Sequence, residues 1–250
     1  MPEALKQNAG QRALARWDNE GGAREHSIRS LPKPVVDLAA RLGVQEASGA
    51  KMVTLTQSGD MRLGKGTRRT RFQARQTIEL TKTGFAWRAT AGPFGAISVC
   101  DAYQDGAGVL DVRLFGRLRL AHMDGPELAK GEVMRYLAEL AWAPDAIISN
   151  KSLDWSEING QTMYVAAGSG AGRGSVRIDF DENGRIGSVF APDRPFTDGR
   201  LTSERPWSGR FFDYRCHHGR WLPFAAEVGW AVDGWIKNYW RGAITSWTAT

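Results

Sequence analysis

One short stretch of the chain, GEVMRYLAELAWAPDAI, brings together the side chains best suited to acid–base chemistry. Its polar residues are Glu132, Arg135, Tyr136 and Glu139. On a helix these four side chains fall within about 100° of one another. Carboxylates can accept and release protons, and a guanidinium or phenol beside them can stabilise developing charge. The spacing therefore predicts a polar stripe on this helix, which faces either water or a ligand.

Both arrangements of the stripe are open at this point. On a solvated helix, Arg135 would pair with Glu132 and Glu139, which stabilises a helix by about 0.2–0.5 kcal/mol per pair. In the protein interior, the carboxylates would need charged or hydrogen-bonding partners. In that case we expect Glu139 to serve as a base, with Arg135 and Tyr136 as stabilising groups and Glu132 as a further carboxylate.

A second group of polar residues lies in the segment GRFFDYR. In a strand, Arg210 and Tyr214 share one face and Asp213 points to the other. We expect Asp213 to pair with Arg135 or Arg241, either as a second candidate base or as a structural ion pair between strand and helix.

The segment CDAYQDG places Asp101 and Tyr103 on one face of a strand, as an acid–base pair or a structural pair. Among the four histidines, only His122 follows an alternating strand pattern, so we expect it to point into the interior of the sheet. HExxH, HxH and clustered acidic spacings do not occur, and we predict neither a metal site nor a cofactor.

The composition is that of a soluble globular protein with a basic surface. The 250 residues carry a formal net charge of +6, and ten are Trp, most of them near the C-terminus. Nucleic-acid motifs are missing, so we predict no nucleic-acid partner. The N-terminus has no apolar signal core, and the two cysteines show no pairing pattern. We therefore expect a cytoplasmic protein that can associate peripherally with membranes.

The periodicity predicts one α+β domain over residues 31–250, preceded by a polar arm over residues 1–30. About ten alternating segments, separated by Gly-containing turns, predict an antiparallel sheet with one buried face. The helix after Gly125 interrupts them, with Pro126 in its first turn and Pro144 beyond its end. Because a sheet of this size must curl, we expect a strongly curved half-barrel wrapped around one or two helices.

Several segments also resemble a bacterial family of unknown function related to the LolA/LppX-like lipoprotein carriers. The segments are LPKPVVDLA, GFAWRATAGPFGAISVCDAYQDGAG, GPELAKGEVMRYLAELAWAPDAI, WSGRFFDYRCHHGRWLPFAAEVGW and YWRG. The resemblance implies a half-barrel fold with an apolar cavity. It also implies ligand-binding roles for the positions that match the family's polar and aromatic pattern, which include Trp142, Tyr214, Arg210, Tyr239, Arg241, Asp101 and Tyr103; we add His122 to this set.

Three functions are compatible with these features, and the least developed is a scaffolding domain of a membrane-associated complex that uses the basic surface. The main hypothesis is a cofactor-independent lyase or isomerase that acts on an apolar, aromatic small molecule bound among the Trp side chains. The excess of ionisable groups over the needs of a passive cavity favours this hypothesis. The alternative is a non-catalytic carrier or sensor of a lipid or another hydrophobic ligand. The sequence does not predict the oligomeric state.

Overall fold

A computed structural model of the chain describes residues 31–63, 68–198 and 201–250. The chain separates into two units, residues 1–31 and residues 32–250. The polar arm predicted over residues 1–30 lies outside the described residues. The second unit contains the sheet and the helices. No helix among the residues described is long and apolar enough to cross a membrane.

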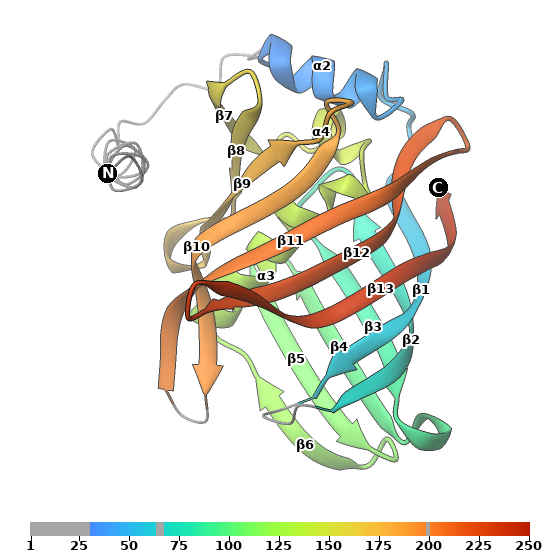
Figure 1. Ribbon diagram of the computed structural model, residues 1–250, viewed down its shortest axis with the longest axis vertical. Coiled ribbons are helices and arrows are strands. Elements are labelled where there is room, and N and C mark those ends of the chain that lie inside the picture. Colours follow the sequence, from blue (N-terminus) through green and yellow to red (C-terminus); the bar gives the residue numbers. More distant parts are fainter. Residues whose placement is uncertain (1–30, 64–67, 199–200) are drawn as a thin grey trace. The chain divides into compact units, whose positions relative to one another are not determined.

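Thirteen antiparallel strands form one curled sheet in the order β6-β5-β4-β3-β2-β1-β13-β12-β11-β10-β9-β8-β7 (Figure 1). Strands that are neighbours in sequence pair with each other, except that β6 and β7 form the two edges of the sheet, and β1 also pairs with β13. The strands are β1 (Met52–Arg62), β2 (Arg69–Glu79), β3 (Phe85–Ala91), β4 (Ile97–Gln104), β5 (Ala107–Leu114), β6 (Leu118–Met123), β7 (Asp154–Asn159), β8 (Thr162–Ala167), β9 (Gly174–Phe180), β10 (Ile186–Asp198), β11 (Leu201–His217), β12 (Arg220–Val232) and β13 (Trp235–Ala249).

The helices among the residues that the structure describes are short. They are α2 (Lys33–Arg41), α3 (Pro126–Ala138) and α4 (Ala146–Ser149), with 3₁₀ turns η1 (Pro93–Gly95), η2 (Glu139–Ala141) and η3 (Gly170–Gly172). Pro126 occupies the first turn of α3, as predicted, because a proline there sacrifices no helical hydrogen bond. The helix α3 packs against β4 and β5 on one side and β8–β10 on the other, so the sheet curls around it.

Alternating burial defines the two faces of the sheet. In β2, Phe72, Ala74, Gln76 and Ile78 are buried, and the residues between them are exposed or partly exposed. We call the face that points toward α3 the inner face and the opposite one the outer face. A close approach between β1 and β13 depends on Gly59, since a Cβ atom there would overlap the backbone of β13. The predicted half-barrel is therefore present.

The expectation of about ten strands is wrong, because the sheet has 13 strands. Two local features depart from the predicted segments: one adds a strand, and the other lengthens two strands. The run GVLDVRLFGRLRLAHM contains a turn at Phe115 and Gly116, both with positive φ angles, and forms two strands instead of one. The β10–β11 hairpin extends through a segment with Pro195 and Pro206, which would ordinarily argue against strands. A shift of register beyond Ala191 accommodates part of this hairpin.

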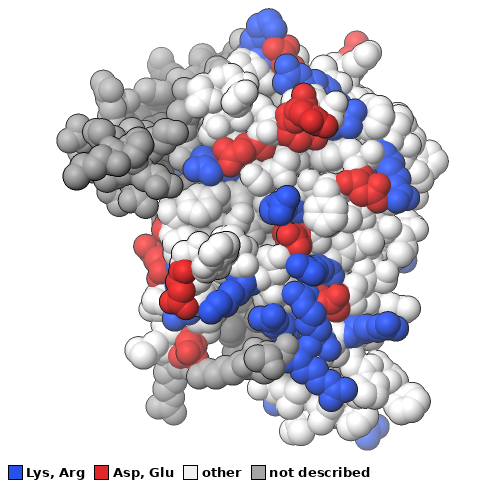
Figure 2. All heavy atoms as spheres, in the orientation of Figure 1, with Lys and Arg blue, Asp and Glu red and all other residues white. Residues whose placement is uncertain are grey.

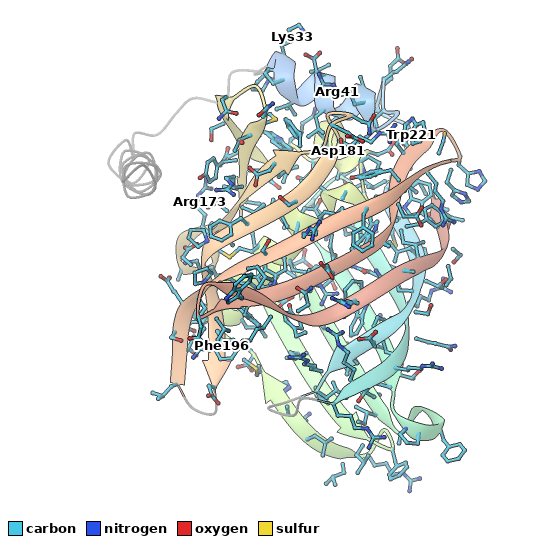
Figure 3. All side chains as sticks on the ribbon, in the orientation of Figure 1. Lys33, Arg41, Arg173, Asp181, Phe196 and Trp221 are labelled. Carbon is cyan, nitrogen blue, oxygen red and sulfur yellow. The ribbon has the colours of Figure 1, made fainter. Side chains whose placement is uncertain are left out.

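Aromatic side chains fill much of the inner face. Trp142 packs edge-on against Phe211, and its ring nitrogen donates a hydrogen bond to the Pro223 carbonyl. Trp247 in turn donates to the carbonyl of Trp142. Among the C-terminal tryptophans, Trp207 and Trp247 are buried in the core, whereas Trp235 is 78% exposed. The guanidinium carbon of Arg185 lies 3.7 Å from the ring centre of Trp221. Figure 3 shows Trp221 near α2, far from Phe196 at the other end of the sheet.

Candidate functional site

The polar stripe on α3 and η2 faces the interior. Glu132 is 4% exposed and Glu139 is 5% exposed, so both carboxyls are removed from bulk water. The solvated arrangement considered from the sequence is thus wrong for these two residues. The physical reason is that α3 lies inside the curl of the sheet, where strands cover both of its sides.

Arg135 is the centre of a buried ion-pair network. Its Nε donates to Glu139 Oε1 at 2.8 Å, and its Nη1 donates to Asp101 Oδ2. The guanidinium also lies 4.8 Å from the ring centre of Phe85 and 5.3 Å from that of Trp87. Such a position stabilises the positive charge through both carboxylates and aromatic rings.

Two further residues complete this network, and sequence reasoning missed both. The Gln76 amide donates to Glu139 Oε2, and Arg194 Nη2 lies 3.8 Å from Glu132 Oε1. Gln76 is a fully buried amide on the inner face of β2, between apolar neighbours. The sequence contained one indication of the role of Gln76: a polar amide at a position where the alternation of the strand predicts a buried side chain. Arg194 gave no such signal because it lies among the prolines of β10.

The network contains more carboxylates than guanidiniums. Glu132 Oε2, Asp101 Oδ1 and Arg194 Nη1 are buried without a hydrogen-bond partner. Burial, reinforced by the nearby charge of Asp101, raises the pKa of Glu132 to about 8. Burial also raises the pKa of Glu139. Burial disfavours the charge of Arg135, but Glu139, Asp101 and Glu132 outweigh that effect and raise its pKa. Glu132 is thus a buried group able to hold or release a proton near neutral pH.

Tyr136 belongs to a different set of contacts. Its hydroxyl donates to the Glu79 carbonyl at 3.0 Å and accepts a hydrogen bond from the Asn150 amide at 2.9 Å. Burial raises its pKa. Because both contacts tie α3 to β2 and to the segment after α4, Tyr136 serves as a structural tether. The structure gives it no contact with the carboxyls of the network.

Asp213 lies on the surface, so its expected pairing with Arg135 or Arg241 is wrong. It has a positive φ angle of 57°, is exposed, and accepts hydrogen bonds from Arg215. The alternation argument failed here because the left-handed backbone conformation interrupts the strand geometry. Arg210 and Arg241 are also exposed and pair with Glu227.

The other predicted ligand-binding residues are dispersed. The Tyr214 hydroxyl donates to the Ile186 carbonyl, and the Tyr239 hydroxyl accepts from the ring nitrogen of Trp207. Tyr103 is buried on the inner face of β4, on the same side as Asp101. His122 is exposed on the edge strand β6, within 3.5 Å of Asp111, so the expectation of an interior histidine is wrong. Of the predicted site, the structure brings together Glu132, Arg135, Glu139 and Asp101.

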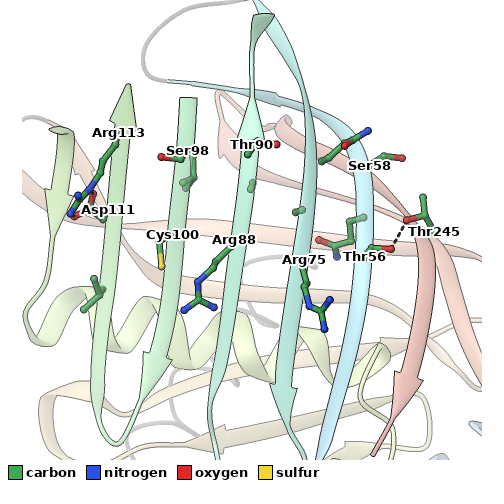
Figure 4. Close-up of a pocket in the computed structure, with 16 residues that line it drawn as sticks. Thr56, Ser58, Arg75, Arg88, Thr90, Ser98, Cys100, Asp111, Arg113 and Thr245 are labelled. Carbon is green, nitrogen blue, oxygen red and sulfur yellow. Dashed lines mark hydrogen bonds and ion pairs between the residues drawn. The ribbon is translucent and has the colours of Figure 1, made fainter. Parts of the chain in front are cut away.

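The inner face continues beyond α3 as an apolar surface. Figure 4 shows α3 crossing behind one end of strands whose other ends extend past it. Ile97, Leu114 and Leu118 face one another across β4, β5 and β6 in this uncovered part. Exposure increases along this row, from partly exposed Ile97 and Leu114 to Leu118 at 62%. This row is the largest departure from a fully covered inner face that we identify.

Two loops at the same end of these strands carry exposed aromatic rings. Phe94 in the β3–β4 loop is fully exposed, and Phe115 in the β5–β6 turn is 74% exposed. The amide of Phe115 donates to the Ala96 carbonyl, which holds the two loops together. We call the set Phe94, Phe115, Leu118 and Leu120 the apolar rim.

The two hollows that we identify lie elsewhere, on the outer face. They have volumes of about 1030 Å³ and 590 Å³, and both are lined by residues of β1–β3. Neither is lined by Glu132, Arg135 or Glu139. The charged network therefore packs against side chains of the sheet. Within the described ranges, no group of three or more His, Cys, Asp or Glu side chains could hold a metal ion.

Fold and site together define a curled antiparallel half-barrel with a buried ion-pair network and an uncovered apolar strip. The chain belongs to DUF6544, a family of unknown function, whose model matches residues 22–242. The resemblance stated from the sequence to a family of unknown function is confirmed, and the half-barrel sheet expected with it is present. No curated protein matches the chain.

Three solved structures are similar to the chain. A domain assigned to outer-membrane lipoprotein sorting, from Vibrio parahaemolyticus, is 11% identical with a TM-score of 0.47, covering 86% of this chain and 90% of that one. A LolA superfamily protein from Nitrosomonas europaea is 8% identical with a TM-score of 0.44, over 85% and 90% of the chains. A DUF1329 family protein from Desulfovibrio piger is 11% identical with a TM-score of 0.36, over 87% and 92%.

Proposed function

We propose that this protein binds an apolar ligand without catalysing a reaction on it. The surface of this ligand resembles that of an acyl chain. The observation that carries the proposal is the strip Ile97–Leu114–Leu118, an apolar continuation of the inner face that α3 leaves uncovered. Exposed apolar surface of this kind is unfavourable in water and is typical of a binding site. An acyl chain lying across β4–β6 would bury it.

The placement of the predicted catalytic residues favours binding over catalysis. An acid–base mechanism needs its groups to converge on one reacting atom. Tyr136 is engaged by backbone and amide partners, and Asp213 is on the surface. Arg135 and Glu139 neutralise each other, which is the arrangement of a structural ion pair.

The apolar rim supports a bilayer as the source of the ligand. Phe94 and Phe115 project from loops beside the uncovered strip, and Arg117 lies two residues after Phe115 in the same turn. Aromatic rings insert at the headgroup level of a membrane, and arginines attract anionic lipids. Figure 2 shows Lys and Arg side chains gathered over the lower part of the region where β13, β1 and β2 run. The proposed docking therefore places the open end of the sheet on an anionic bilayer.

A matched pair of variants tests ligand binding. Leu118→Asp places a charge in the strip, whereas Val109→Asp places one on the outer face of β5, at another exposed apolar residue. The probe is N-phenyl-1-naphthylamine, a neutral apolar fluorophore. We expect Leu118→Asp to weaken its binding by about 10-fold or more, given about 1.5–3 kcal/mol for a buried leucine. Val109→Asp should bind as the wild type does.

Equal affinities of the two variants, or no binding of the probe by the wild type, would contradict the proposal.

Co-sedimentation with phosphatidylglycerol vesicles tests docking separately. We expect the double variant Phe94→Ser/Phe115→Ser to lose most of the vesicle binding while keeping its affinity for the fluorophore.

One observation favours a second function, the acid–base enzyme. Glu132 is buried, has an unpartnered oxygen, and has a pKa raised to about 8 by burial and by Asp101. These are properties of a general acid or base. The two functions predict different outcomes when the protein is incubated with a bacterial lipid extract. If the protein only binds lipids, mass spectrometry will find the retained lipids chemically unchanged. If it is an enzyme, the mass of one lipid component will change, and Glu132→Gln will abolish that change.

A further inference from the structure

The outer face of β1–β5 contains the larger hollow, on the side of the sheet opposite the apolar strip (Figure 4). Its volume of about 1030 Å³ is sufficient for a small organic molecule. Its lining is rich in hydroxyl and guanidinium groups, including Thr56, Thr90, Ser98, Arg75 and Arg88. The hollow is therefore chemically distinct from the apolar strip.

Two arginines lie directly opposite each other in this hollow. Arg75 of β2 and Arg88 of β3 are register partners in the antiparallel ladder, so their side chains leave the same face. Figure 4 shows both guanidinium groups pointing toward the same end of the strands. Within the part of the chain that the structure describes, neither makes an ion pair or a side-chain hydrogen bond.

Other arginines of the same sheet do have carboxylate partners. Arg113, which lines the same hollow, pairs with Asp111. Arg69 on β2 pairs with Asp60, and Arg241 on β13 pairs with Glu227. The sheet thus supplies carboxylates to arginines on both sides of the Arg75–Arg88 pair. Like charges directly opposite each other destabilise a ladder, so an anion bound beside both guanidinium groups would relieve their repulsion.

We propose that Arg75 and Arg88 form a binding site for a phosphate-type oxyanion. Two guanidinium groups side by side match the oxygens of a phosphate monoester through paired N–H donors. Thr90 also lines the hollow, but it lies on the side away from the two guanidinium groups, so we assign the contacts with the anion to the two arginines. The site occupies the outer face and does not depend on the apolar strip.

The test measures the thermal stability of the protein with and without inorganic phosphate, at constant ionic strength. Without phosphate, Arg75→Gln removes the like-charge contact, and we expect its melting temperature to rise by about 1–2 °C. With phosphate at about 20 times its dissociation constant, the wild type should gain about 4–7 °C. The variants Arg75→Gln and Arg88→Gln should lose that gain, and Arg215→Gln on β11 should keep it.

Phosphate also stabilises proteins by exclusion from their surfaces, and that effect acts equally on every variant. Equal gains in the wild type and in Arg75→Gln/Arg88→Gln would therefore overturn the proposal. The source of the phosphate group is distinguished with phosphatidic acid and phosphatidylcholine vesicles. Binding to phosphatidic acid that needs both arginines identifies a lipid headgroup, whereas a loss of phosphate stabilisation with unchanged vesicle binding identifies a soluble ligand.

Discussion

Replacing Arg135 by Met tests whether the buried network is the structural ion-pair centre described above. The substitution keeps much of the apolar volume of the side chain but removes the charge that Asp101 and Glu139 share. Breaking a buried ion pair from one side costs about 3–5 kcal/mol, because the remaining charge is buried without a partner. The side chain of Arg135 is 18% exposed, so solvent compensates little of this loss.

The assay is urea unfolding at pH 8 followed by tryptophan fluorescence. We expect Arg135→Met to lower the free energy of unfolding by about 3–5 kcal/mol. The triple variant Arg135→Met/Asp101→Asn/Glu139→Gln should recover most of this loss, since it leaves no unpaired charge. The control is Arg215→Met, which breaks the exposed pair with Asp213 and should have no resolvable effect. A loss below about 1 kcal/mol for Arg135→Met, similar to the control, would refute the reasoning.

Three further predictions concern residues around the same core. Glu132 has a pKa of about 8 when folded and an ordinary value of 4.5, so the native state binds its proton more tightly between these pH values. The free energy of unfolding should therefore fall as the pH rises from about 5 to 8, by up to about 1.4 kcal/mol per unit, and Glu132→Gln should remove that decline. Tyr136→Phe removes the shorter of the two hydrogen bonds of the Asn150 amide and leaves only the 3.4 Å bond to Thr83, so it should cost about 1–3 kcal/mol in urea unfolding, with unchanged fluorophore binding. Asp145→Ala leaves Arg220 without its two-bond carboxylate partner and should cost about 3 kcal/mol, whereas Asp145→Asn should cost less.

Local patterns in the sequence predicted the elements of the fold well. Alternating residues in β1–β5 predicted an antiparallel sheet, and Pro126 predicted where α3 begins. The turn at Phe115 escaped prediction because it interrupts an otherwise regular alternation without an Asn-Gly or Pro signal. Such a turn depends on the backbone adopting positive φ angles, which residue type indicates only weakly for phenylalanine.

The candidate site was predictable only where its residues share one element. The stripe of Glu132, Arg135 and Glu139 follows from helical spacing, and its burial follows from the position of the helix within a curled sheet. Partners from distant strands were not predictable, because pairing with Asp101 or Arg194 depends on three-dimensional packing. The contacts that hold the network together span tens of residues of sequence, and neither spacing nor composition encodes them.

Photochemical labelling with a benzophenone-bearing fatty acid tests the proposed function most directly. After irradiation and proteolysis, mass spectrometry locates the labelled peptides. The account predicts labels on peptides that contain Ile97, Leu114 and Leu118, and their loss in Leu118→Asp. Labels confined to the outer face, or labelling that is unchanged in Leu118→Asp, would contradict it.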